Sequence, residues 1–171
     1  IKKLTNIEAV IGYPTNYDFP SIVPPSEGGT YFNNQARIKR HALDTEINAC
    51  SDKSFIRKMM FESADIVNAF YIPVTNSMNI FAGILNKPVY DKDASYAANL
   101  GAIGMVIGHE IGHAFDNSGA QYDEIGRKIN WWTEKDEAEF KKKQEHFVEY
   151  YSRFEVIDDV VQDSEITIGE N

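Results

Sequence analysis

Residues 106–113 read Val-Ile-Gly-His-Glu-Ile-Gly-His, and the last five of them form the pattern H-E-x-x-H. Side chains four residues apart lie on the same face of a helix, so His109 and His113 can bind one metal ion from one side. Glu110 lies about 100° around the helix from His109, where it can accept a proton from a water that the metal activates. The pattern therefore predicts zinc-dependent hydrolysis with Glu110 as the catalytic base.

The sequence around this pattern predicts one long helix from Ala94 to about Asp116. Asp93 is a favourable N-cap, and Gly119 is a candidate terminator. Each glycine inside the helix costs about 1 kcal/mol relative to alanine. We therefore expect another backbone segment to pack closely against this helix.

Two histidines leave the predicted metal site incomplete, because a catalytic zinc usually has three protein ligands and one open position. A metzincin would supply a third histidine at position 119, which is Gly119 here, so that class is excluded. A later glutamate is the remaining common ligand. By residue type alone the candidates are Glu134, Glu137, Glu139, Glu165 and Glu170.

The composition narrows the class of protein. The net charge of the 171 residues is −9 and the only run of three lysines, 141–143, lies among acidic residues, so nucleic acid is not an expected partner. Cys50 is the single cysteine, which excludes an intrachain disulfide, and we expect it to be buried. No stretch approaches the roughly 20 apolar residues of a membrane span. The chain has no initial methionine and ends abruptly at Glu170-Asn171, and we therefore interpret it as a fragment of a longer protein.

The remaining patterns predict a mixture of short strands and helices. Alternating apolar residues indicate a strand at 7–11 and a β-hairpin with strands at 67–73 and 78–85. Apolar residues at helical spacing indicate helices at 35–48 and 54–63. Thr133 and Asp136 resemble a capping box for a last helix that ends near Phe154. One stripe of this helix is aromatic, and we expect it to be core: Phe140, Phe147, Tyr151 and Phe154.

Taken together, these segments resemble peptidase family M13, the neprilysin-like metallopeptidases. The resemblance is carried by residues 12–14, 67–71, 80–85, 106–126, 130–133 and 166–171. It implies an α+β fold with a thermolysin-like (gluzincin) zinc-helix region and a β-hairpin packed beside the active-site helix. It also implies that residues 1–66 are the end of a preceding domain with a connecting segment, and that residues 67–171 begin the catalytic domain and are truncated just after the third ligand.

The resemblance also assigns the site. It implies one zinc ion bound by His109, His113 and Glu170, with Asn68 and Ala69 holding the backbone of a peptide substrate. Two readings stay open for Ile84 and Val106, which line an apolar specificity pocket or belong to the core.

The implied function is that of a zinc metalloendopeptidase acting on oligopeptides, of the bacterial PepO type, for which a cytoplasmic location is favoured. Family members carry further catalytic residues after the third ligand, so we expect the chain to need the rest of its parent protein and to be poorly active alone. The alternative is a catalytically inert domain that binds peptides or holds a structural zinc with a fourth protein ligand.

Overall fold

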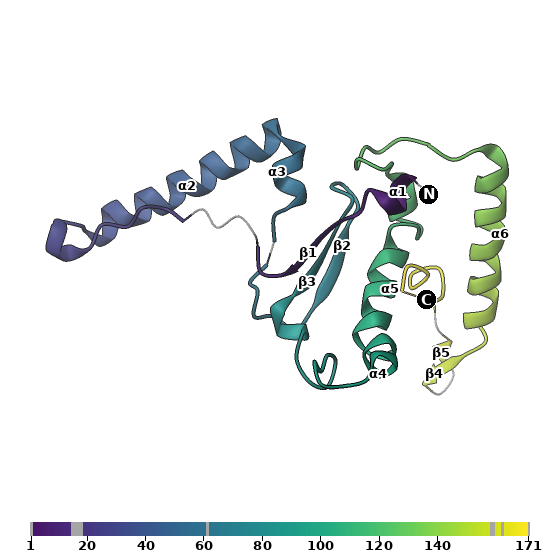
Figure 1. The fold of residues 1–171 in the computed structure, drawn as a ribbon. Helices are drawn as coiled ribbons and strands as arrows, with labels where there is room; N and C mark the ends of the chain where they lie inside the picture. The colour runs from purple at the N-terminus through teal and green to yellow at the C-terminus, as the bar shows by residue number, and fades with distance from the viewer. Residues whose placement is uncertain (1, 15–18, 61, 158–159, 162, 171) are drawn as a thin grey trace.

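The protein is described by a computed structural model that covers residues 2–14, 19–60, 62–157, 160–161 and 163–170. At its centre lies a three-stranded sheet in the order β1 (Glu8–Gly12), β3 (Ser77–Phe81), β2 (Ala69–Ile72) (Figure 1). Strand β1 runs parallel to β3, and β2 runs antiparallel to it. Strand β2 is therefore an edge strand, and its outer side has no neighbouring strand among the described residues.

The predicted β-hairpin is confirmed. Strands β2 and β3 pair in register from Ala69 with Ile80 to Ile72 with Ser77, and the turn between them places Asn76 in the left-handed region with a φ of 47°. Asn76 is fully buried, and its side-chain amide donates to the backbone oxygens of Lys3 and Glu124 at 3.1 and 3.0 Å. The turn is thus tied to two distant parts of the chain.

The prediction of one helix over residues 94–116 is wrong. The structure has two helices, α4 (Tyr96–Gly101) and α5 (Ile103–His113), separated at Ala102, whose φ and ψ are −105° and −93°. Ser95, and not Asp93, caps α4, and its hydroxyl accepts from the amide of Ala98 at 3.2 Å. Gly101, a poor helix former, immediately precedes the break.

Helix α5 packs across the sheet, and the hydrophobic core lies between them. Buried Ala69, Met78 and Ile80 of the sheet meet Ile103 of α5, surrounded by partly buried apolar side chains such as Val106. The expected close approach of another backbone to the helix glycines is wrong: a Cβ at residues 101, 108 or 112 would meet nothing within 4 Å, and at 104 mainly the Leu100 side chain. Side chains fill this core instead.

The remaining helices and strands of the described residues complete the fold. They are α1 (Lys2–Thr5), η1 (Pro25–Glu27), α2 (Tyr31–Ser51), α3 (Lys53–Arg57), η2 (Ala82–Ile84), η3 (Gly119–Gln121), α6 (Glu134–Tyr151), β4 (Glu155–Ile157) and β5 (Val160–Val161). Helix α2 extends away from the sheet, and α6 stands on the opposite side of the molecule (Figure 1). The domain boundary at residue 66 stays a prediction, and the parts on either side of it share the central sheet.

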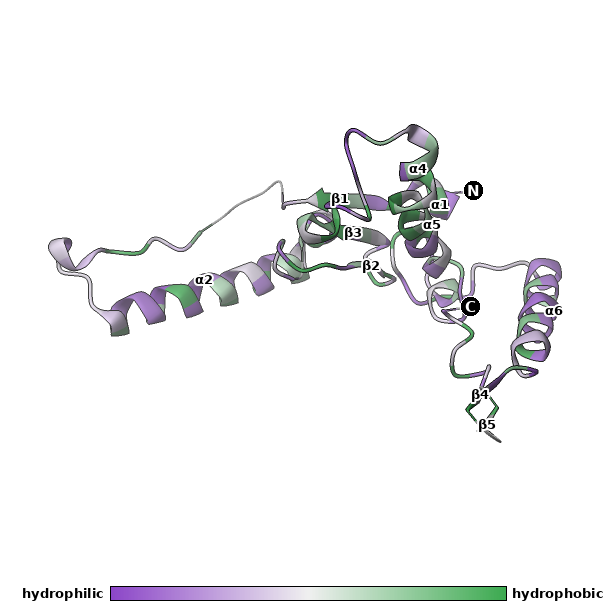
Figure 2. Ribbon diagram, turned by 90° about the horizontal axis from the view of Figure 1, so that it is seen from below, coloured by the Kyte–Doolittle hydropathy of each residue, from purple (hydrophilic) through white to green (hydrophobic). Residues whose placement is uncertain are grey.

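Helix α6 begins as predicted but does not bury its aromatic stripe. Thr133 caps it by accepting from the amide of Asp136 at 3.1 Å. Phe147 and Phe154 are 45% and 47% exposed, and Phe140 and Tyr151 are only partly buried. Apolar residues are denser on α4 and α5 than on α6 (Figure 2).

Cys50, expected to be buried, is exposed. Among the described residues there is no helix that combines the length and the apolar character needed to span a membrane.

Candidate metal centre and peptide cleft

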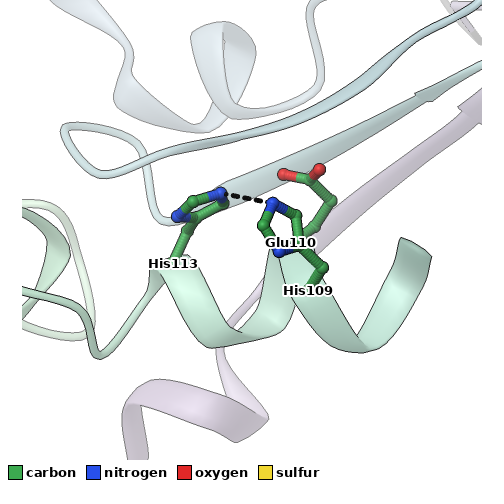
Figure 3. Close-up of side chains that lie close together, drawn as sticks. All are labelled: His109, Glu110 and His113. Carbon is green, nitrogen blue, oxygen red and sulfur yellow. Dashed lines mark hydrogen bonds between the residues drawn. The ribbon is translucent and has the colours of Figure 1, made fainter. Parts of the chain in front are cut away.

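Helix α5 brings the two histidines of the H-E-x-x-H pattern together. The Nε2 atoms of His109 and His113 are 2.9 Å apart, and the rings meet edge to face with centroids 4.4 Å apart (Figure 3). Both side chains leave the same face of α5, as the four-residue spacing predicts. Their lone pairs can therefore converge on one ion.

Asp116 sets the tautomer of His113. Its Oδ2 lies 2.8 Å from Nδ1 of His113, so Nδ1 carries the proton and donates it to the carboxylate. The Nε2 lone pair is then free for a metal. The other oxygen, Oδ1, accepts from the amides of Ser118 and Gly119 at 2.7 and 2.6 Å, which fixes the orientation of the carboxylate.

Glu170 approaches the histidine pair from the C-terminal segment. Its Oε2 lies 3.3 Å from Nε2 of His109 and 3.8 Å from Nε2 of His113. The preceding Gly169 allows this approach, because a Cβ there would lie 3.1 Å from the side-chain oxygen of Asn117 and 3.4 Å from Oδ2 of Asp116. The structure thus brings the sequence-predicted residues His109, His113 and Glu170 together, while Asn171 lies outside the described residues.

These three side chains fit a zinc ion. Tetrahedral zinc with Zn–N bonds of about 2.05 Å places two nitrogens about 3.3 Å apart. The observed separations of 2.9, 3.3 and 3.8 Å bracket that value. Two imidazoles and a carboxylate are also a recurring donor set of catalytic zinc.

Glu110 lies beside the histidines and is 5% exposed (Figure 3). Burial raises the pKa of its carboxyl above the ordinary value, against the opposing effects of His113, His109 and the Tyr71 amide. Its Oε2 has no hydrogen-bond partner among the described residues. A carboxylate with a raised pKa and an uncommitted oxygen is suited to exchange a proton with a substrate or a water.

The residues predicted to hold a substrate form one wall of a cleft above this site. The cleft has a volume of about 590 Å³, and Asn68, Ala69, Glu110 and Glu170 are among its lining residues. Ala69 belongs to edge strand β2, and its backbone amide donates to Oδ1 of Asn68 at 2.9 Å. Ile84 and Val106 also line the cleft. Both residues also pack against the core, and a role of theirs in substrate specificity stays a prediction.

A comparison with protein families decides the affiliation. The model of peptidase family M13 matches residues 68–171. The chain belongs to peptidase family M13. The resemblance read from the sequence is thereby confirmed, and the proteins it resembles are zinc metallopeptidases.

Curated M13 relatives match nearly the whole chain. It is 38% identical over 157 residues to the neutral endopeptidase of Lactobacillus helveticus, covering 88% of this chain and 23% of that protein. It is 33% identical over 181 residues to neprilysin-1 of Trittame loki, covering 99% of this chain and 25% of that protein. The chain therefore spans about a quarter of the length of these relatives.

Solved M13 structures share the fold. Zinc metalloprotease ZMP1 of Mycobacterium tuberculosis, in complex with an inhibitor, superposes with a TM-score of 0.73 at 34% identity, covering 99% of this chain and 26% of that one. PepO of Lactobacillus rhamnosis HN001 superposes with a TM-score of 0.74 at 27% identity, covering 99% of this chain and 27% of that one. The α+β fold of the gluzincin class, with a hairpin beside the zinc helix, is thus confirmed.

Sequence reasoning missed two residues that the structure connects to the site. No local rule assigned a role in the site to Asp116, yet its Oδ2 lies 2.8 Å from Nδ1 of His113. Its position three residues after His113, at the end of the zinc helix, was the available signal. The other residue, Lys3, carries no sequence signal, since the two carbonyl oxygens to which its ammonium donates lie more than 100 residues away.

Proposed function

We propose that the protein carrying this sequence is a zinc-dependent metalloendopeptidase that hydrolyses peptide bonds in oligopeptides. The observation that carries the proposal is the convergence of His109, His113 and Glu170 beside the buried Glu110, at a cleft whose wall is an edge strand. The M13 relatives, which include a neutral endopeptidase, support the same activity.

The roles of the residues follow from their positions. His109, His113 and Glu170 would hold one zinc ion, and Asp116 would keep His113 in the tautomer that can bind it. A bound zinc supplies Lewis acidity and lowers the pKa of water toward about 7. Glu110 would accept a proton from the attacking water and deliver it to the leaving amine, a function suited to its raised pKa.

The substrate would bind as an added strand. An extended peptide can pair with a free sheet edge through main-chain hydrogen bonds, and its side chains then enter alternate pockets. Asn68 and Ala69 at the β2 edge would hold the peptide backbone, and Ile84 and Val106 would contact an apolar side chain of the substrate. Such a site suits flexible peptides better than folded proteins.

An inert structural-zinc domain is the alternative. A structural site is closed by a fourth protein ligand. Among the described residues, the side chains gathered around the Nε2 atoms are those of His109, Glu110, His113 and Glu170, and the nearby Asp116 is committed to Nδ1 of His113. This arrangement favours the catalytic proposal.

The test is an assay of Glu110→Gln on an internally quenched peptide, in the longest natural polypeptide that carries this sequence. Loss of hydrolysis by a factor of at least about 10² is expected, with zinc content unchanged. Glu137→Gln, which changes a partly exposed carboxylate on α6 that pairs with Lys141, is the matched control and should keep wild-type turnover. Wild-type protein that binds zinc but cleaves no peptide, or a Glu110→Gln variant with full turnover, would refute the proposal. Weak activity of the 171-residue chain alone stays a prediction, tested in the same assay.

A further inference from the structure

Lys3 is a lysine buried in the protein interior, with 2% of its surface exposed. Its Nζ donates to the backbone oxygens of Gly119 and Tyr122 at 2.6 and 2.7 Å. The rings of Tyr71, Phe115 and Trp131 surround the ammonium, with centroids 6.0, 5.8 and 5.6 Å away. Burying an ammonium is costly unless hydrogen bonds and charges compensate it, so this position needs a reason.

The contacts of Lys3 continue to the metal site through one residue. The carbonyl of Gly119 accepts from Lys3, and the amide of the same residue donates to Oδ1 of Asp116 at 2.6 Å. Oδ2 of Asp116 then holds Nδ1 of His113 at 2.8 Å. Three consecutive hydrogen bonds therefore link the buried lysine to a histidine of the metal site.

The loop that makes this link has little room to move. A Cβ at Gly119 would lie 1.9 Å from the backbone oxygen of His113, so the loop passes directly against the end of the zinc helix. The charge of Asp116 also acts on Lys3: together with Asp123 it raises the pKa of the ammonium, while burial lowers that pKa more strongly, to about 8. Lys3 and Asp116 are thus coupled both by hydrogen bonds and by charge.

We propose that Lys3 is a positioning residue of the metal centre: it anchors the loop 116–122 and thereby holds Asp116 against Nδ1 of His113. Without its ammonium, the carbonyls of Gly119 and Tyr122 lose their donor and the loop can shift. Asp116 then holds the proton on Nδ1 less firmly, and the Nε2 lone pair is less available for a metal. The inference rests on the metal site in the proposed function, but not on peptide hydrolysis.

The test compares Lys3→Met with Lys2→Met in the longest natural polypeptide that carries this sequence. Lys2 is the exposed neighbour on the same short helix and is the matched control. The first readout is the ring N–H proton of His113 in the NMR spectrum, identified as the resonance that Asp116→Asn removes. The second readout is the dissociation constant for zinc, measured by competition with a chromophoric chelator.

Lys3→Met should broaden or remove the ring N–H resonance and weaken zinc binding by about threefold to tenfold, less than the 10–100-fold typical of losing the carboxylate partner itself. Lys2→Met should leave both readouts unchanged. If Lys3→Met does not fold, Lys3→Gln, which keeps a shorter donor, is measured in the same way and should shift both readouts in the same direction.

A folded Lys3 variant with an intact ring N–H resonance and wild-type zinc affinity would overturn the inference, because Lys3 would then only stabilise the fold. Both readouts are independent of turnover. A protein that shows these changes but hydrolyses no peptide would therefore refute the proposed function and leave the role of Lys3 intact.

Discussion

Replacing Asp116 by asparagine changes only one group of the side chain, yet we expect it to weaken zinc binding strongly. In the wild-type protein, Oδ1 accepts from the amides of Ser118 and Gly119 and Oδ2 accepts from Nδ1–H of His113. An asparagine has one oxygen and one NH₂ group, so it cannot accept on both sides. If the NH₂ faces His113, the ring must accept at Nδ1 and carry its proton on Nε2, which then cannot bind a metal.

The opposite orientation of the amide is also unfavourable. Its NH₂ group would face the two backbone amides, so two hydrogen bonds would be lost and two donors would oppose each other. Loss of a carboxylate partner of a metal-binding histidine typically costs 10–100-fold in affinity, or about 1.4–2.7 kcal/mol. Asp116→Ala loses the partner but adds no competing donor. We therefore expect Asp116→Asn to weaken zinc binding at least as much as Asp116→Ala, near the upper end of this range.

The measurement is zinc affinity by chelator competition at neutral pH, with circular dichroism as a check of folding. Asp93→Asn is the matched control, because Asp93 is exposed and pairs only with its neighbour Lys92 among the described charges. Zinc affinity in Asp116→Asn within about twofold of wild type would refute the assignment of the tautomer to Asp116. So would an alanine variant that binds zinc clearly more weakly than the asparagine variant.

Three further predictions follow from the same geometry. Glu170→Ala should lower the zinc affinity measured by the same competition, and Glu165→Ala should leave it unchanged, because Glu170 is the one of the two that reaches the histidine pair. Equal zinc affinity in both variants would remove Glu170 from the ligand set. In the metal-free protein, burial raises the pKa of Glu110 above its unfolded value of 4.5, so the free energy of unfolding falls as the pH rises from 4.5 through the folded pKa. Wild type should therefore lose stability relative to Glu110→Gln over this pH range, as measured by urea unfolding. A difference in stability that stays constant with pH would contradict this prediction. The pKa of Lys3 is lowered from 10.5 to about 8, so the unfolded chain binds more protons than the folded protein between these pH values. Wild type should therefore gain stability relative to Lys3→Met as the pH rises over this range, by at most about 1.4 kcal/mol per pH unit. A stability of wild type relative to Lys3→Met that falls with pH would show the opposite pKa shift.

The sequence by itself determined the chemistry of the site wherever that chemistry depends on local spacing. His109 and His113 share a helix face because they are four residues apart, and Glu110 follows from the same helical geometry. The hairpin was equally readable, since two alternating apolar segments flank a short turn. The choice of Glu170 among several glutamates came from the family pattern, because no local rule connects a residue so far along the chain to the zinc helix.

Tertiary contacts decided the rest. The break at Ala102 was not readable from the apolar pattern, which continues from α4 into α5 and is interrupted by Asn99 and glycines. The exposure of Phe147 and Phe154 depends on whether another element covers α6, which a helical stripe cannot reveal. Lys3 reads as an ordinary lysine beside Lys2, and only folding places its ammonium on the carbonyl of Gly119, 116 positions away. Helical spacing is set by the backbone of a few neighbouring residues, whereas a buried charge is fixed by partners that only the folded chain brings together.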